Sequence, residues 1–64
     1  MTTFRIPKIV HKNARETAIA FDDRLHEEIV QLSKQAPDDV IWYRAEVEKE
    51  TRSFTIISLV GETN

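Results

Sequence analysis

The sequence has no cysteine, one glycine and two prolines among its 64 residues. Without cysteine the chain forms no disulfide, no zinc-thiolate site and no thiol nucleophile, and its composition suits a reducing compartment. With so little glycine and proline there is no linker, repeat or low-complexity segment, so we expect residues 1–64 to form one compact domain. A chain this short buries only about 60% of the surface that its unfolded form exposes, so oligomerisation would add to its stability.

Long apolar runs are also missing. No run approaches the roughly 20 residues that span a bilayer, and the N-terminal MTTFRIPK has neither a signal-peptide core nor a lipidation motif. These absences predict a cytoplasmic protein without a membrane partner.

The spacing of apolar residues predicts a small two-layer α+β domain, with about four mostly antiparallel strands and one helix packed on one face, in the order β-β-α-β-β. The strands are expected near residues 3–10, 17–21, 40–48 and 53–60, and the helix near residues 23–35. Pro7 removes a ladder donor and predicts that the first strand either lies at a sheet edge or is interrupted. The alternation of Thr17, Ile19 and Phe21 predicts the short second strand.

The helix is predicted from apolar residues that recur at spacings of four, three and four. These residues are Leu25, Ile29, Leu32 and Ala36. Asp22 is the expected N-cap, with Asp23 beside the positive end of the helix dipole. Pro37 and the two aspartates after it end the element.

The C-terminal part predicts a hairpin whose two strands differ in pattern. Apolar and polar residues alternate along residues 41–48, as in a half-buried strand, whereas SFTIISLVG at residues 53–61 is apolar on both faces. The expected register, with Glu48 opposite Ser53, directs one set of pairs toward the helix: Val47 with Phe54, Ala45 with Ile56, Tyr43 with Ser58 and Ile41 with Val60. It directs the other set away from the helix: Arg44 with Ile57 and Trp42 with Leu59.

A single helix covers one sheet face, so the second face needs another cover. Either another molecule covers it, or residues 1–12 fold back across it. Trp and Arg are enriched at interface hot spots, and the expected partner-binding residues are Trp42, Arg44, Ile57 and Leu59. The function predicted from this face is a small non-enzymatic protein-binding module, such as a regulator or an inhibitor, that forms a homodimer or docks on a larger protein.

The sequence offers little for catalysis, and we predict no catalytic residue, no cofactor and no metal. None of the three serines lies in a nucleophile-elbow motif. His26 follows Asp22 and Asp23 by four and three residues, a spacing that shares one helix face. A metal needs three or four converging ligands, and this group falls short of a site.

The alternative function is a small nucleic-acid-binding regulator that uses the basic N-terminal segment. Although the formal net charge is −2, residues 1–16 are basic. The cations that would contact phosphates are Arg5, Lys8, Lys12 and Arg15. No aromatic residue is interleaved with them after Phe4 to stack on bases.

Within this alternative, TAIAFDDRLHEEIVQLSKQ resembles the strand and first helix of ribbon-helix-helix DNA-binding proteins. The resemblance implies a dimer whose paired strands enter the major groove. The strand offers Thr17 and alanines in place of side chains that read base edges. The segment after Pro37, where that family has its second helix, alternates as a strand.

Overall fold

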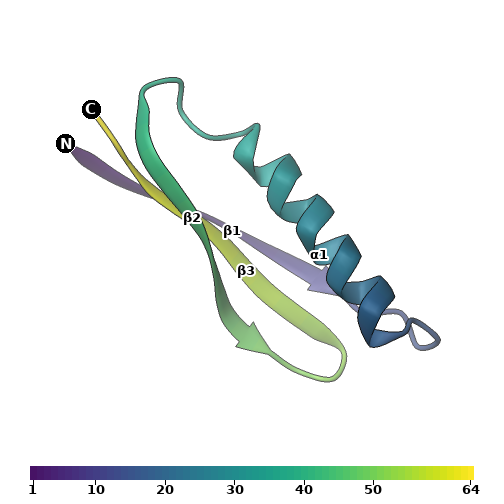
Figure 1. Cartoon of the computed structure of the whole chain (residues 1–64). Coiled ribbons are helices and arrows are strands. Elements are labelled where there is room, and N and C mark those ends of the chain that lie inside the picture. Colours follow the sequence, from purple (N-terminus) through teal and green to yellow (C-terminus); the bar gives the residue numbers. More distant parts are fainter.

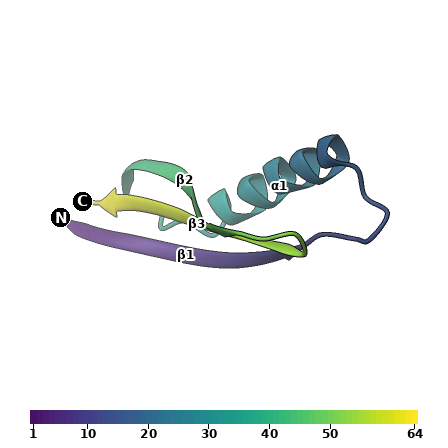
Figure 2. The same cartoon turned by 90° about the horizontal axis from the view of Figure 1, so that it is seen from below.

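The computed structural model describes residues 1–64. Along the chain it contains strand β1 (Thr2–His11), helix α1 (Ala18–Ser33), strand β2 (Val40–Glu50) and strand β3 (Phe54–Thr63). The strands form one antiparallel sheet in the order β1-β3-β2, and α1 lies on one face of it (Figure 1, Figure 2). The small two-layer α+β architecture is therefore confirmed. The predicted fourth strand and the order β-β-α-β-β are wrong, because the order is β-α-β-β.

The missing strand is the segment around Thr17, which begins the helix instead. Thr17 has extended backbone angles (φ −74°, ψ 160°), and its hydroxyl accepts a hydrogen bond from the backbone N–H of Ala20 at 3.1 Å. Thr17 is therefore the N-cap, and Asp22 lies inside the helix. Phe21 packs toward the core with Leu25, one helical turn later, whereas Ile19 points to solvent. The short segment from Thr17 to Phe21 fits both the two-residue period of a strand and the period of a helix, and in the structure it begins the helix.

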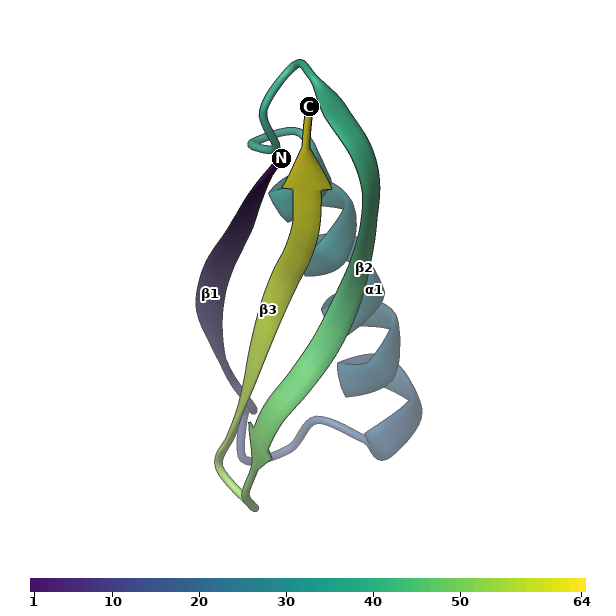
Figure 3. The ribbon, with the colours of Figure 1, turned by 90° about the vertical axis from the view of Figure 1, so that its left-hand side faces the viewer.

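Strand β3 lies in the middle of the sheet and pairs with a neighbour on each side (Figure 3). It contains most of the buried residues, including Ile57, Ser58 and Leu59, which are at most 1% exposed. This position explains why SFTIISLVG is apolar on both faces. The N-terminal segment forms β1 beside β3 and does not fold across the outer face. That outer face, which points away from α1, is not covered by another element (Figure 2).

The hairpin register differs from the expected one and reverses the two faces of β3. Val47 lies opposite Ile57 and Ala45 opposite Leu59, so these pairs face the helix. The displacement is an odd number of residues, and side chains alternate between faces along a strand, so every β3 side chain changes face. The tight turn after Glu50 and a bulge at Glu48 produce this displacement. The Thr51 hydroxyl closes the turn, because it accepts a hydrogen bond from the backbone N–H of Phe54 at 3.0 Å.

The core forms between α1 and only two of the three strands. Its buried centre consists of Val10, Leu32, Ile57 and Leu59. The partly buried apolar side chains packed around it are Phe4, Ile6, Phe21, Leu25, Ile29 and Ala36. None of these residues belongs to β2, so β2 is attached to the sheet without contributing a side chain to the core.

The two sheet edges are β1 and β2. One step beyond the last β1–β3 pair, the backbone N–H of Lys12 donates to the carbonyl oxygen of Ser53 at 2.8 Å. Bonded and non-bonded pairs alternate along an antiparallel ladder, so the even-numbered residues of β1 bond to β3 and the odd-numbered ones turn N–H and C=O outward. Pro7 is odd-numbered, and its missing N–H therefore costs no ladder bond.

Candidate protein-binding surface on strand β2

Strand β2 carries half of the large apolar side chains that remain exposed. Ile41 and Tyr43 are each 53% exposed, Val47 is 62% exposed, and Trp42 is 39% exposed. Isolated exposed apolar residues are common on protein surfaces, but a group of them on one strand indicates an interaction site. We call this strand, with both of its side-chain faces and its free backbone edge, the β2 surface.

The helix side of the β2 surface is apolar. Tyr43, Ala45 and Val47 lie opposite Gly61, Leu59 and Ile57, the buried centre of the sheet. They extend the apolar layer of β3 to the sheet edge, yet they stay exposed because α1 packs over β1 and β3. Sequence reasoning placed Tyr43 and Val47 on the correct face. It counted them as core because it did not place β2 at an edge.

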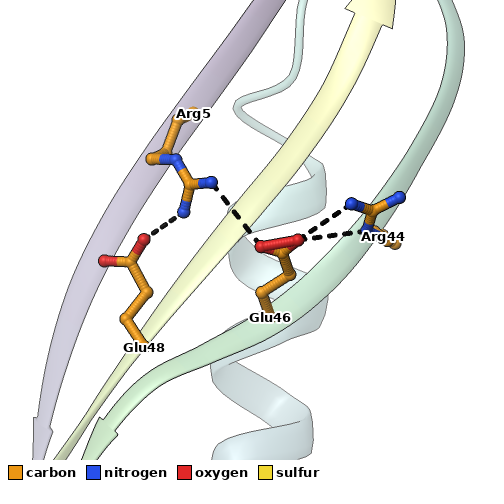
Figure 4. Close-up of polar contacts among 4 residues, drawn as sticks. All are labelled: Arg5, Arg44, Glu46 and Glu48. Carbon is orange, nitrogen blue, oxygen red and sulfur yellow. Dashed lines mark hydrogen bonds and ion pairs between the residues drawn. The ribbon is translucent and has the colours of Figure 1, made fainter.

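The outer side of the β2 surface is polar and aromatic. The guanidinium carbon of Arg44 lies 5.2 Å from the centre of the Trp42 ring, a cation–π arrangement. Arg44 also donates to Glu46, from Nε at 3.2 Å and from a terminal nitrogen at 2.9 Å. Arg5 of β1 reaches across β3 to Glu46 at 3.5 Å and to Glu48, as Figure 4 shows. Between Arg5 and Trp42 the face is hollowed by about 400 Å³.

These cations influence the titration of Glu46. Hydrogen bonding from Arg44, supported by the positive charges of Arg44 and Arg5, lowers the pKa of the Glu46 carboxyl below its ordinary value. Each cation stabilises the ionised form of the carboxylate. Glu46 therefore stays negatively charged at neutral pH, and the outer side of β2 presents a fixed cation at Arg44 next to a fixed anion.

The free edge of β2 also offers unpaired backbone groups. Along the regular β2–β3 ladder, Trp42, Arg44 and Glu46 lie opposite even-numbered residues of β3. These are the β3 residues that turn toward β2, given that the odd-numbered ones bond to β1. The N–H and C=O groups of Tyr43, Ala45 and Val47 therefore point away from the sheet. Bulges between Val40 and Trp42 and between Val47 and Lys49 limit the regular edge to this segment.

The structure brings together only two of the four predicted partner-binding residues. Trp42 and Arg44 lie side by side on the outer face, in contact with each other. Ile57 and Leu59 are buried under α1 on the opposite face, so the prediction of one exposed face shared by all four residues is wrong. The large apolar residues that were expected to face the helix and that the structure leaves exposed are Ile41, Tyr43 and Val47. The many charged residues of β2 are typical of an edge strand, and they were the sequence signal that could have placed β2 at the edge of the sheet.

The basic residues of the alternative function do not form one patch. Arg5 lies on the outer face and pairs with Glu46 and Glu48. Lys8 lies opposite Ile57 on the helix face and pairs with Glu28 of α1 at 3.2 Å. Lys12 and Arg15 lie in the connection that follows β1.

The ribbon-helix-helix resemblance is not supported by the fold. Its strand segment forms the N-cap and first turn of α1, and its second-helix segment forms β2. Without the ribbon strand, the paired strands that this family inserts into the major groove are missing from this segment.

Elsewhere the molecule shows two more hollows, one of about 530 Å³ against residues 26–31 of α1 and one of about 440 Å³ between the start of α1 and the β2–β3 turn. Phe21 and Leu25 line the second of these together with Lys12, Glu50 and Arg52. No three His, Cys, Asp or Glu side chains lie close enough together to hold a metal ion. No helix of the structure has the length and apolar character needed to cross a membrane.

Comparison of the chain with protein-family models, with curated proteins and with solved structures found no match.

Proposed function

We propose that the chain is a small non-enzymatic protein-binding module, acting as a regulator or an inhibitor, and that its binding element is the β2 surface. The observation that supports this proposal most strongly is the contrast between two properties of β2. It contributes no side chain to the core, yet it displays Tyr43, Val47 and Trp42 to solvent. The whole chain has no cysteine, a composition that suits a reducing compartment, so we place this function in the cytoplasm.

The binding mode that suits this surface is strand addition. A strand of a partner would pair with the outward N–H and C=O groups of Tyr43, Ala45 and Val47, and main-chain hydrogen bonds would supply affinity. Specificity would come from the side chains on the two faces. An apolar partner residue would cover Tyr43 and Val47, while Arg44 and Glu46 would select complementary charges.

No observation favours the nucleic-acid alternative over this function. Its cations lie on different faces of the sheet, and Arg5 and Lys8 already contact carboxylates. Those carboxylates would repel a phosphate backbone approaching the same cations.

The proposal is tested with Val47→Lys, which puts a charge on the helix side of the β2 surface. The matched control is Val30→Lys on the exposed face of α1, where the side chain is 54% exposed compared with 62% for Val47. Tagged wild-type and variant chains are compared by light scattering and by affinity capture from a cell extract. We expect Val47→Lys, but not Val30→Lys, to lose self-association or a captured protein. If the wild type does neither, or if both variants behave as wild type, the proposed function is wrong.

A further inference from the structure

We infer that β2 pairs with β2 of a second copy of this chain, antiparallel, around a two-fold axis that passes through Ala45. This inference rests on the proposed function and names the partner. It commits to one occupant and to one register, and both follow from the backbone and charge pattern of residues 42–48.

The direction of the free backbone groups restricts the register. In an antiparallel pair, outward-pointing residues of one strand must lie opposite outward-pointing residues of the other. On β2 these residues are odd-numbered, namely Tyr43, Ala45 and Val47. A two-fold axis must therefore pass through a residue and not between two residues. This rule also places both helices on the same face of the joined sheet.

Charge then selects one of the three registers whose axis lies at, or next to, Ala45, the centre of the regular edge between the two bulges. An axis at Ala45 places Arg44 opposite Glu46 of the second copy, twice by symmetry, and opposite charges across a strand pair are favourable. An axis at Arg44 would place two arginines opposite each other. An axis at Glu46 would place two glutamates opposite each other. Each of these two arrangements is unfavourable, because like charges directly opposite each other repel.

The apolar residues agree with the same register. With the axis at Ala45, Tyr43 lies opposite Val47 of the second copy on the helix side. The two uncovered strips then meet and form one apolar layer that continues the buried centre at Ile57 and Leu59. Two three-stranded sheets become one continuous sheet. Because α1 runs obliquely behind the sheet, its first turns project on the β2 side, toward the second copy (Figure 3).

Charge reversal tests the register directly. Arg44→Glu and Glu46→Arg each place like charges opposite each other in the homodimer, and we expect the Kd of self-association to rise about tenfold or more for each. Mixing the two single variants restores both opposite-charge pairs and should give a heterodimer. The double variant Arg44→Glu with Glu46→Arg should self-associate again. These variants change only exposed or half-exposed side chains, so circular dichroism should show the same fold.

Single cysteines provide a test that does not depend on charge, because the chain has no cysteine of its own. Residues facing each other in a hydrogen-bonded antiparallel pair have Cα atoms about 5.5 Å apart, within the range that a disulfide bridges. We expect Ala45→Cys to form a covalent dimer under mild oxidation. Val47→Cys is the matched control, because its copies lie four residues out of register, on the order of 13 Å apart.

The outcomes separate the two proposals. Rescue by mixing, together with selective cross-linking of Ala45→Cys, supports self-pairing in this register. Cross-linking of Val47→Cys as efficient as that of Ala45→Cys overturns the register. A wild-type chain that stays monomeric by light scattering at every concentration overturns self-pairing itself. If that monomer still captures a foreign protein and Val47→Lys abolishes the capture, the proposed function stands with a different partner.

Discussion

The ring of Phe4 lies over Gly61, its partner across the β1–β3 ladder: a Cβ atom at residue 61 would fall 2.7 Å from Cζ of Phe4. It would also collide with the carbonyl oxygen of Trp42 on the other neighbouring strand. The glycine has no unusual backbone angle. Its absent side chain, and not its flexibility, is what the sheet requires at this point.

Gly61→Ala is therefore expected to lower the free energy of unfolding by about 1–3 kcal/mol, as overpacking does in other cores. The sign makes this prediction distinctive, since Gly→Ala at an unstrained position normally stabilises by about 0.4–1 kcal/mol. Urea denaturation of the two chains measures the difference. In a double-mutant cycle, Gly61→Ala should cost less in a Phe4→Ala background than in the wild type, although a cost should persist because the Trp42 carbonyl remains. A more stable Gly61→Ala chain would contradict the close approach.

Substitutions at the two candidate N-caps should distinguish the observed start of α1, with Thr17 as the N-cap, from the start expected from the sequence, with Asp22 as the N-cap. Thr17→Ala removes the hydroxyl that accepts the N–H of Ala20 and should cost about 1 kcal/mol, whereas Thr17→Asp should keep the cap and favour the helix dipole. Asp22→Ala is the control, and we expect a change within about 0.5 kcal/mol. Chemical denaturation followed by circular dichroism measures all three. A larger loss for Asp22→Ala than for Thr17→Ala would return the N-cap to Asp22.

The face of β3 that points to the helix can be checked by truncating Leu59, which is fully buried. Leu59→Ala should cost about 2–5 kcal/mol, and the milder Ile57→Val about 0.5–1.5 kcal/mol. Ile19→Ala, at a position that is 78% exposed, is the control and should change stability by about 0.5 kcal/mol or less. Thermal and urea unfolding are suitable measurements. Near-neutral effects at both β3 positions would place them on an open face.

The pH dependence of stability should include a contribution from Glu46. Its pKa is lowered in the folded chain, first by hydrogen bonding from Arg44, so its stabilising contribution is complete above the unfolded carboxyl pKa of about 4.3. That contribution is lost as the pH falls through the lower, folded pKa. Carboxyl resonances followed by NMR should show Glu46 titrating at a lower pH than in Arg44→Gln. Identical titration in the two chains would show that Arg44 does not hold this carboxylate.

Several features of the fold follow from local patterns in the sequence. The period of Leu25, Ile29 and Leu32 predicts the helix, and the alternation of Trp42 with Tyr43 predicts a strand with Tyr43 toward the helix. Pro7 predicts an edge strand or an interrupted one, and the structure has the edge strand, where an outward-facing position tolerates a missing N–H. Each of these features depends on residues close together in the chain.

The features that sequence reasoning missed depend on contacts between distant segments. Thr17 to Phe21 fit either a short strand or a first helical turn, and only the packing of Phe21 on the sheet decides between them. The hairpin register depended on the exact turn and on the bulge at Glu48, and a small error there moved Ile57 and Leu59 to the wrong face. The exposure of Val47 followed from strand order, which no local pattern encodes.

Pro7 has a consequence for how far the sheet can grow. Its ring occupies an outward-facing position in the middle of β1, where an added strand would need an N–H donor. One edge of the molecule is therefore open to pairing and the other is blocked. Under the β2 pairing proposed above, growth would end after a single partner is added and would give a closed assembly, not a fibre. A change such as Pro7→Val would remove this stop and leave an extended strand at each end, a known route to aggregation.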